Sequence, residues 1–484
     1  MKSATRLALA SLAALTLLLA GCSGDGSAGD PSGSLATTVA PGGTSVPNAA
    51  APSTTTSSST LAPSRSIGCD GPVTVGVVTD VSGALAVYGA HMVRGVPIGF
   101  AYATDGEAQT GAEQSYFLDD CELRVLVRDD QSNPDIGEAA ALDLIETDGA
   151  SIVIGSVTSG VTTKLQQVAR DHNVILIAGP DSSTDLSGGR FDPNTFRISR
   201  SAYQDHMAIC DLLVNDLGRK TFVQLAADYP VGHSGAQAYT DACSFYGGEF
   251  LAEPVFLPAD TQDFSEYLIP LAEADADAFL LTWAGGSFPA LLQSAFAEGA
   301  LDDDTVLGVP FVDNLVVTSF FSSAVGTTSV IPYHYTSPSN PINDYLVDQA
   351  AVVFSALPDL YDADGMNAAI MIVEALKATD GASDADSLKA ALEGLTFDGP
   401  KGRVEIRAAD HVAVQDLYVV KLANLDDPEL RFYENVATAR PEPPCLLEGE
   451  YETRCSSLPA GSLGGLIKLQ CVNRHRWVVA ARPR

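Results

Sequence analysis

The stretch Ile152-Val153-Ile154-Gly155-Ser156-Val157-Thr158-Ser159-Gly160 decides the fold class that this sequence predicts. Its β-branched residues lead into glycines and hydroxyl side chains, which is typical of a buried strand that ends in a loop. Apolar residues then recur at the spacing of one buried helical face, namely Val161, Leu165, Val168 and Ala169. The stretch therefore predicts a strand, a loop and a helix in succession.

Outward from this stretch, short apolar strands alternate with helical patterns in both directions. The other predicted strands are Val73–Val78, Leu123–Val127, Val174–Ile177, Phe222–Leu225, Ala278–Thr282 and Val306–Val309. Such alternation is typical of an α/β fold in which helices cover parallel sheets. Because residues 67–438 exceed what one hydrophobic core usually serves, we expect two lobes.

The first residues have the layout of a cleavable export signal. Lys2 and Arg6 precede an apolar run, Leu7–Ala20, that is too short to be a membrane span. The segment Leu19-Ala20-Gly21-Cys22 resembles the bacterial lipobox, in which a signal peptide, here residues 1–21, is removed and the cysteine is lipidated. We therefore expect an exported chain that is lipid-anchored to the outer face of the cytoplasmic membrane. An ordinary secretory signal with a chance cysteine is the alternative.

Residues 22–66 form a compositionally distinct segment. Ser, Thr, Ala, Gly and Pro dominate it, and it has no aromatic residue. Such a chain cannot bury enough apolar surface to offset the entropy that it would lose on ordering. We expect a disordered tether between the anchor and the lobes.

The overall charge excludes one class of partner. The formal net charge is −34, and Lys and Arg are scattered rather than gathered into a basic patch. We therefore expect no binding to nucleic acid, because such binding depends on neutralising phosphates. A soluble, self-repelling surface accounts for the acidity.

The last residues, 439–484, differ from the rest of the chain. Ile467–Arg484 carries several basic residues and no acid, against the overall charge. We expect this atypical tail to be disordered, either as a partner-binding extension or as an artefact of the reading frame.

The chain has eight cysteines, which in an exported protein point to disulfides. Their positions before neighbouring strands, on consecutive helices and within the tail favour three pairs: Cys69–Cys121, Cys210–Cys243 and Cys445–Cys455. Cys471 is left unpaired. The spacings fit no zinc template, so we expect no structural metal.

Several motifs resemble, in order, those of type 1 periplasmic binding proteins of the branched-chain amino acid, amide and urea group. The segment Val75–Gly95, with Ser82-Gly83 followed by Tyr88-Gly89, is similar to the family's first strand and loop. The further matching motifs are Arg128-Asp129-Asp130 through Asn133-Pro134, Ile152–Gly160, Asp228-Tyr229, Gly247-Gly248, Asp263-Phe264-Ser265, and Gly399-Pro400 with Asp410-His411. The resemblance covers about Asp70 to Asn424.

The resemblance implies two Rossmann-like lobes joined by a three-strand hinge. The N-terminal lobe would comprise residues 67–200 and 338–396, and the C-terminal lobe residues 201–337 and 397–438. The connecting strands would lie near Arg197–Tyr203, Tyr333–Pro338 and Phe397–Ala408. A small polar solute would be captured between the lobes by hinge closure and passed to the permease and ATPase subunits of an ABC importer.

Candidate ligand residues lie where predicted strands end. Hydroxyls and free backbone N–H groups at Ser159 and Gly160 meet at a helix N-terminus, which suits a carboxylate or carbonyl oxygen. Capping of the helix by Thr158 or Ser159 is the structural alternative. By resemblance, the Pro180 carbonyl and the Ser182 hydroxyl would also contact the solute.

Aromatic residues would complete the ligand site. By resemblance, Tyr88 from the first loop and Tyr229 from the facing lobe would cover apolar parts of the solute while their hydroxyls donate or accept hydrogen bonds. Trp283, just after a predicted strand, is a further candidate for the wall. Structural tyrosines in a core are the alternative.

One departure from the family concerns the solute's charge. Amino-acid-binding members carry an acid at the end of the strand that corresponds to Val306–Val309, but here Pro310-Phe311 follows. Because a buried ammonium needs a counter-ion, either Asp313 or Asp181 takes that role, or the solute has no ammonium. Branched-chain amino acids, short amides, urea-like solutes and carboxylates therefore stay open.

Two alternatives belong to other functional classes. Gly232-His233-Ser234-Gly235 resembles the nucleophile elbow of α/β hydrolases, but Ala236 stands where the final glycine is required. The sequence has no Walker loop, no dinucleotide fingerprint and no His-Glu-x-x-His motif. We expect a binding protein and no enzyme, without cofactor or metal. An extracytoplasmic ligand sensor is the second alternative, which sequence alone separates poorly from a transport receptor.

Overall fold

The computed structural model describes residues 66–258, 260–283, 287–301, 306–308, 310 and 312–458. The predicted signal peptide, the lipidation site Cys22, the tether up to residue 65, the end of the tail and Cys471 lie outside the described residues.

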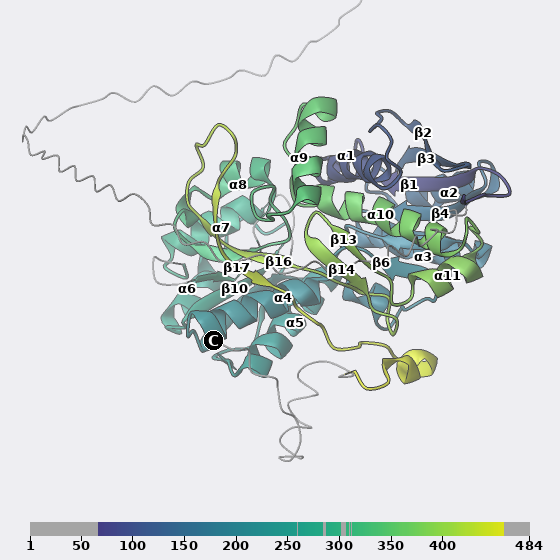
Figure 1. Cartoon of the computed structure of the whole chain (residues 1–484). Coiled ribbons are helices and arrows are strands. Elements are labelled where there is room, and N and C mark those ends of the chain that lie inside the picture. Colours follow the sequence, from purple (N-terminus) through teal and green to yellow (C-terminus); the bar gives the residue numbers. More distant parts are fainter. Residues whose placement is uncertain are drawn as a thin grey trace, which may run out of the picture. The chain divides into compact units, whose positions relative to one another are not determined.

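The first half of the chain builds a six-stranded sheet in the order β2-β3-β1-β4-β5-β6 (Figure 1). All neighbours are parallel except β2, which pairs antiparallel with β3. The strands are β1 Val73–Thr79, β2 Glu113–Leu118, β3 Cys121–Asp129, β4 Ala150–Gly155, β5 Ile175–Ala178 and β6 Thr195–Arg197. The helices of this part are α1 Ala86–Ala103, α2 Pro134–Glu146 and α3 Ser159–His172, joined later in the chain by α9 Pro341–Phe354, α10 Asp362–Ala378 and α11 Ala385–Leu392.

Side chains of the central strand β1 enter two different cores. All of its residues are buried, as expected of a parallel strand covered on both faces. Val75 and Val77 belong to one core with residues of α1 and α10, whereas Val78 belongs to another with residues of α2 and α3. Helices therefore cover both faces of this sheet, and we call this part the N-terminal lobe.

The middle of the chain builds a second parallel sheet, in the order β11-β10-β7-β8 with β9 also paired to β7. Its strands are β7 Thr221–Ala227, β8 Glu249–Phe250, β9 Val255–Leu257, β10 Ala278–Thr282 and β11 Val306–Gly308. Its helices are α4 Ala202–Asp211, α5 Pro230–Tyr246, α6 Ser265–Glu273, α7 Phe288–Ala297 and α8 Asn314–Phe320. Two further cores flank this sheet, and we call this part the C-terminal lobe.

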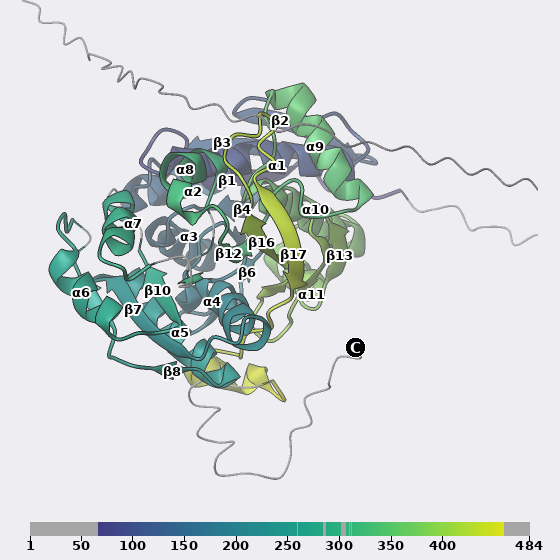
Figure 2. The same ribbon diagram turned by 90° about the vertical axis from the view of Figure 1, so that its left-hand side faces the viewer.

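Two small antiparallel sheets complete the fold. The sheet of β12 Thr328–Ile331, β16 Leu417–Leu422 and β17 Tyr433–Ala439 contributes to the cores of the C-terminal lobe (Figure 2). The other sheet consists of β13 Thr396–Gly399, β14 Gly402–Ile406 and β15 Ala413–Val414. The α/β class and all seven strands expected from the sequence are confirmed.

Up to β17, the described part of the chain passes between the lobes at three places, whereas the sequence predicts crossings near Arg197–Tyr203, Tyr333–Pro338 and Phe397–Ala408. One leads from β6 to α4 through Ile198–Ser201, and the second leads from β12 to α9. The third follows β15 at Gln415-Asp416 instead of Phe397–Ala408. The reason is apolar packing, because Phe397, Val404 and Ile406 are buried in the core of the N-terminal lobe. The Gln415 side chain donates to the Ile198 carbonyl at 2.7 Å and so joins two crossings.

All three predicted disulfides are present. Cys69–Cys121 ties the entry to β1 to the start of β3, and Cys210–Cys243 ties α4 to α5 inside a core of the C-terminal lobe. Cys445–Cys455 closes a loop within residues 440–458. These residues are therefore ordered, contrary to the disorder expected for the tail, because buried cysteine and leucine side chains hold them against Phe191.

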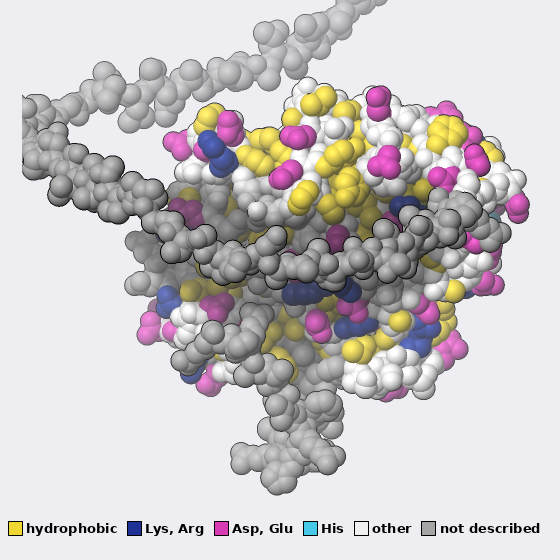
Figure 3. Space-filling view, in the orientation of Figure 1, with side chains coloured by type: hydrophobic (Ala, Val, Ile, Leu, Met, Phe, Trp, Pro, Cys, Tyr) yellow, Lys and Arg dark blue, Asp and Glu magenta, His cyan; other side chains and the backbone are white. Residues whose placement is uncertain are grey.

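The surface has no single dominant charged patch on the face seen in Figure 3, where Asp and Glu side chains are spread over both lobes. Within the described ranges, no helix combines the length and the apolar character needed to cross a membrane. In the same part of the chain, no three or more His, Cys, Asp or Glu side chains are grouped to hold a metal ion.

Gly89 provides a test of the packing between α1 and the loop after β1. A Cβ atom at this position would lie 1.6 Å from the Asp80 carbonyl oxygen, a backbone atom that cannot easily move. We expect Gly89→Ala to destabilise the protein by about 3 kcal/mol, as overpacking does, measured by urea unfolding. Gly71→Ala is the matched control, because its Cβ would meet nothing within 4 Å. Equal midpoints for the two variants would contradict this packing.

Candidate ligand site between the lobes

The candidate site begins where parallel strands of the N-terminal lobe end. The loops after β1, β4 and β5 leave the same edge of the sheet, which is where open α/β folds bind ligands. Asp80 shapes the first of these loops, because its carboxylate accepts hydrogen bonds from the amides of Gly83 at 2.5 Å and Leu85 at 2.7 Å. This bonding fixes the start of α1 and therefore the position of Tyr88.

The loop after β4 leaves the Ser159 hydroxyl available. Thr158 is the N-cap of α3, and its hydroxyl accepts from the Val161 amide at 3.3 Å. Ser159 is the first helical residue and is half-buried, and Gly160 is exposed. Among the described residues, the Ser159 hydroxyl has no hydrogen-bond partner. Capping is thus the role of Thr158, and Ser159 can bind a solute oxygen at the helix N-terminus.

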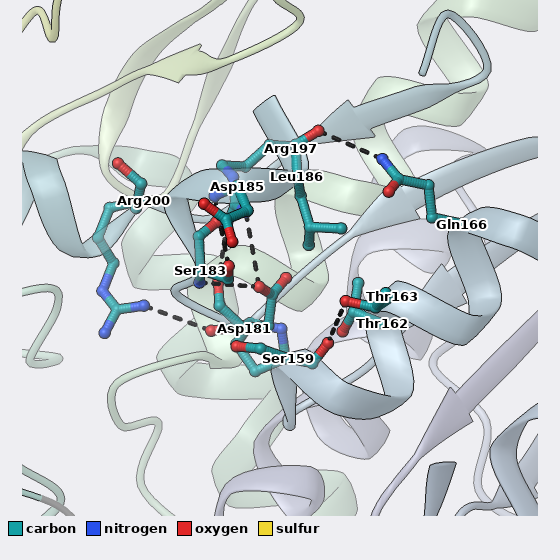
Figure 4. A network of polar contacts seen from close by, with 12 residues as sticks. Ser159, Thr162, Thr163, Gln166, Asp181, Ser183, Asp185, Leu186, Arg197 and Arg200 are labelled. Carbon is teal, nitrogen blue, oxygen red and sulfur yellow. Dashed lines mark hydrogen bonds and ion pairs between the residues drawn. The ribbon is translucent and has the colours of Figure 1, made fainter. Parts of the chain in front are cut away.

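The loop after β5 carries Pro180, Asp181 and Ser182. The buried Asp181 carboxylate accepts from the Ser183 amide at 3.0 Å and forms an ion pair with Arg197 at 3.5 Å. Figure 4 shows the segment of Asp181 and Ser183 between Arg200 and the start of α3 at Ser159. Arg197 already balances the Asp181 charge through Oδ1, which makes this acid less suited than Asp313 to pair with a solute ammonium, although its buried Oδ2 also has no hydrogen-bond partner among the described residues. Ser182 is half-buried, and within the described part of the chain its hydroxyl has no partner.

Arg200 links this loop to Tyr88 and was not foreseen as a site residue. Its guanidinium donates to the Pro180 carbonyl at 3.3 Å and to the Tyr361 hydroxyl at 3.2 Å, and it lies 5.2 Å from the centre of the Tyr361 ring. The Tyr361 ring in turn lies 5.8 Å from that of Tyr88. The position of Arg200 within a predicted crossing was the one available signal, whereas nothing in the sequence marked Tyr361.

The C-terminal lobe contributes Asp313 to this region. Asp313 is 1% exposed and is the N-cap of α8, where its Oδ1 accepts from the Val316 amide at 2.8 Å. Its Oδ2 is buried and has no hydrogen-bond partner among the described residues. Burial raises the pKa of Asp313, although the Val316 and Leu315 amides and the more distant Arg94 oppose this effect.

Tyr88 lies within electrostatic reach of Asp313, although the two residues belong to different lobes. Burial raises the pKa of the Tyr88 phenol, and Tyr361, Asp313 and Asp359 raise it further, whereas Arg200 lowers it. Acids of both lobes and the Arg200 guanidinium therefore all act electrostatically on this phenol. The arrangement suits a solute with separated charges, because each end would find its opposite.

Asp313 belongs to an interlobe acid cluster, which we define as Asp313, Asp359 and Asp362. Asp359 accepts from the Asn314 amide of the C-terminal lobe at 2.7 Å, and Asp362 forms an ion pair with Arg94 at 2.7 Å. Burial raises the pKa of Asp359 to about 8, with Asp313 and Asp362 adding to the effect and the Asn314 and Leu360 amides opposing it. Burial likewise raises the pKa of Asp362 to about 6, against the effect of Arg94.

Two predicted aromatic residues differ in their surroundings. Tyr229, at the N-cap position of α5, is half-buried and packs on the same core of the C-terminal lobe as Tyr88. Trp283 is 8% exposed within that core, where its indole N–H donates to Ser287 at 3.2 Å and its ring meets Phe264 edge-on at 5.5 Å. Tyr229 is therefore the better placed of the two to reach a solute.

A surface groove of about 780 Å³ lies elsewhere and is lined by residues of α1, α9, α10 and β13. None of the predicted ligand residues lines it. Its mouth carries exposed acids such as Asp105 and Asp398, together with Lys377, which pairs with Glu374 at 2.9 Å. The chemistry described above lies between the lobes, so we do not assign the solute to this groove.

The serine of the hydrolase-like motif lies in a helix. Ser234 falls within α5, which begins at Pro230, so it does not stand on a sharp turn between strand and helix. The neighbouring His233 pairs with Asp228 at 2.8 Å, and both side chains are exposed. A nucleophile elbow requires the turn that is missing here.

Two α/β lobes, several crossings and polar side chains contributed by both lobes define a solute-binding receptor. A family model described as periplasmic binding protein matches residues 72–427. The chain therefore belongs to the periplasmic binding protein family, in agreement with the resemblance seen in the sequence.

Individual relatives point to ABC transport systems. Leu/Ile/Val-binding protein homolog 6 of Brucella melitensis is 23% identical over 365 residues, which cover 73% of this chain and 88% of that protein. A crystal structure of an ABC-type branched-chain amino acid transporter from Rhodopseudomonas palustris has 27% identity and a TM-score of 0.66, covering 76% of this chain and 96% of that one.

A further solved structure shares the fold alone. It is a solute binding protein of an ABC transporter from Rhodopseudomonas palustris, in complex with 3,4-dihydroxybenzoic acid. Its identity is 22% and its TM-score is 0.62, with 76% of this chain and 97% of that chain covered.

Asp359 should make folding stability depend on pH. Its pKa is raised in the folded state, so between about pH 4 and 8 the folded protein holds a proton that the unfolded chain releases. The contribution of this group to stability is therefore present at low pH and is lost as the pH rises toward 8. We expect Asp359→Asn to become more stable relative to wild type from pH 5 to pH 9, measured by urea unfolding.

The exposed Asp348 supplies the control for this measurement. Asp348→Asn should leave the pH profile of stability parallel to that of wild type. A parallel profile for Asp359→Asn as well would show that Asp359 titrates normally in the folded protein.

Proposed function

We propose that this protein is the solute receptor of an ABC importer and that it holds a small amino acid between its lobes. The observation that carries the proposal is the buried Oδ2 of Asp313, which has no hydrogen-bond partner among the described residues and belongs to a carboxylate within electrostatic reach of Tyr88 in the other lobe. A buried carboxylate without a partner is costly, so a cationic group of the solute would stabilise it. The other candidate acid, Asp181, also has an unpartnered Oδ2, but the buried Arg197 already balances its charge.

The opposite end of the solute would meet the N-terminal lobe. The hydroxyls of Ser159 and Ser182 and the amides at the start of α3 are suited to a carboxylate. Tyr88 and Tyr229 would cover the side chain of the solute from the two lobes. Binding to both lobes favours the closed arrangement, which a permease and its ATPase can then distinguish from the open one. No covalent step is needed for this cycle.

The family of the chain and its named relatives support this assignment. Export is implied by membership of the periplasmic binding protein family. The lipid anchor at Cys22 and the removal of residues 1–21 are proposals that rest on the sequence motif alone.

The solute class can be tested by thermal shift with the purified protein. A ligand that binds the folded, closed state stabilises it by RT ln(1 + L/Kd), where L is the free ligand concentration, so the unfolding temperature rises with the logarithm of L once this exceeds Kd. We expect leucine, isoleucine or valine to produce a shift, and urea, short amides and benzoate to produce none. A shift with benzoate alone would indicate that the solute is an aromatic carboxylate instead of an amino acid. The role in import is tested separately, by measuring uptake of the responding solute in a strain that lacks the protein. Unchanged uptake in that strain would contradict this role.

Asp313→Asn tests the ammonium contact. We expect the dissociation constant for the responding amino acid to rise about 100-fold by calorimetry, equal to about 2.7 kcal/mol, because the charge pair is lost. Asp348→Asn, on the exposed face of α9, should leave the affinity unchanged. Unchanged affinity in the Asp313 variant would show that Asp313 is not the counter-ion of a solute ammonium.

Cys22→Ala tests the anchor. We expect the wild-type protein to incorporate labelled palmitate and to sediment with membranes, and the variant to lose both properties while keeping its fold. Membrane association without any lipid label would point to a different mode of attachment.

A further inference from the structure

Residues 440–458 cross between the lobes for a fourth time. After β17, which pairs with β16 in the C-terminal lobe, the chain returns to the N-terminal lobe, where it forms a short helical turn at Gly449–Cys455 (Figure 1). The family model stops at residue 427, so this segment lies beyond the part of the chain that the family shares. It lies outside the three crossings that the family implies.

The beginning of the segment is fixed to the C-terminal lobe and to the third crossing. The buried Gln204 of α4 donates to the Pro441 carbonyl at 3.4 Å. Arg440 donates to the Val414 carbonyl at 2.9 Å and pairs with Asp416 at 3.1 Å, on either side of Gln415. These contacts hold the segment beside the hinge.

Leu446 touches both lobes. Its side chain packs on the core formed by α4, α5 and their neighbours in the C-terminal lobe. It also lies against Gly188 of the N-terminal lobe, where a Cβ would come within 3.2 Å of the Leu446 Cβ. The segment therefore packs against both lobes at Leu446, in addition to connecting them.

The end of the segment is fixed to the N-terminal lobe. Cys445, Leu447 and Cys455 are buried in a small core with Phe191, and the disulfide closes this loop. Arg454 lies over the Phe191 ring at 5.2 Å, a geometry that favours cation–π attraction.

Hydrogen bonds reinforce this anchor. The Arg454 guanidinium donates to the carbonyls of Ala408 at 2.8 Å and Ala409 at 2.9 Å, and it pairs with Glu393 at 2.7 Å. Apolar packing, hydrogen bonds and an ion pair therefore hold the turn on the N-terminal lobe, and the disulfide, which lies within the segment, holds the shape of the turn.

The link between the two anchors is stiff. It has the sequence Arg440-Pro441-Glu442-Pro443-Pro444, and proline-rich segments adopt an extended conformation that persists over several residues. Arg407 of the N-terminal lobe donates to the Pro443 carbonyl at 2.7 Å and supports it midway. A stiff segment of this composition resists both shortening and lengthening of the distance between its two anchors, whereas a flexible linker resists neither over short distances.

We propose that residues 440–458 are a strut that limits how far the lobes open in the absence of solute. Lobe opening is a rotation absorbed by a few residues at the crossings. A stiff connection anchored on both lobes restricts that rotation and raises the population of arrangements near the closed one. Such a bias strengthens the apparent affinity for any solute that binds the closed form, whichever solute that is.

Two variants of the full-length protein separate stiffness from anchoring. Replacing Pro441, Pro443 and Pro444 by Ser keeps their carbonyl acceptors and the disulfide but makes the link flexible. The double variant Cys445→Ala/Cys455→Ala releases the anchor instead. The double variant Cys210→Ala/Cys243→Ala removes a disulfide that lies within the C-terminal lobe and serves as the control.

The measurement is amide hydrogen exchange of the solute-free protein, together with its radius of gyration from X-ray scattering. In both strut variants we expect exchange at the crossings, residues 198–201 and 415–417, to accelerate by about tenfold, and the radius of gyration to increase. The control should lose thermal stability without either change. Unaltered exchange and dimensions in the proline variant, or the same acceleration in the control, would overturn the proposal.

Discussion

The need to neutralise one buried guanidinium governs how the two lobes meet. Arg200 lies in the first crossing, and its charge is balanced by Asp205 at 3.3 Å on α4 of the C-terminal lobe. Its two terminal nitrogens donate one hydrogen bond each to the N-terminal lobe, to the Pro180 carbonyl and to the Tyr361 hydroxyl. A buried cation that loses any of these partners is costly, so the crossing, the loop after β5 and the start of α10 are held in one arrangement. Tyr88 packs against that arrangement.

The chemistry between the lobes follows from the direction of the strands. Because β1, β4 and β5 are parallel, their carboxyl ends share one edge, and the loops that leave it bring Tyr88, Ser159 and Ser182 to the same side of the N-terminal lobe. The C-terminal lobe adds an acid at the N-cap of α8. Hydroxyls and a helix N-terminus of one lobe and an acid of the other are therefore supplied by different elements, and under the proposed function a solute that bridges them would stabilise the closed arrangement.

The proposed strut at residues 440–458 and the interlobe acid cluster have opposite effects on lobe closure. The cluster brings acidic groups of both lobes together, which is unfavourable unless protons, Arg94 or a cationic solute compensate. The strut holds the lobes near each other even so. In the proposed cycle, the strut restrains opening and the acid cluster disfavours closure, and a cationic solute would favour closure by compensating the acids.

The sequence alone predicted the α/β class, seven of the strands and the three disulfide pairs, and it proposed most of the candidate ligand residues. These features depend on local periodicity, on residue type and on motifs, all of which are written in short stretches such as Ile152–Gly160. Only the tertiary structure decided that Asp181 is paired with Arg197, that Asp313 has an unpaired oxygen, and that residues 440–458 are ordered. These outcomes depend on which distant groups become neighbours on folding, and neither hydrogen-bond partners nor buried charges can be read from spacing along the chain.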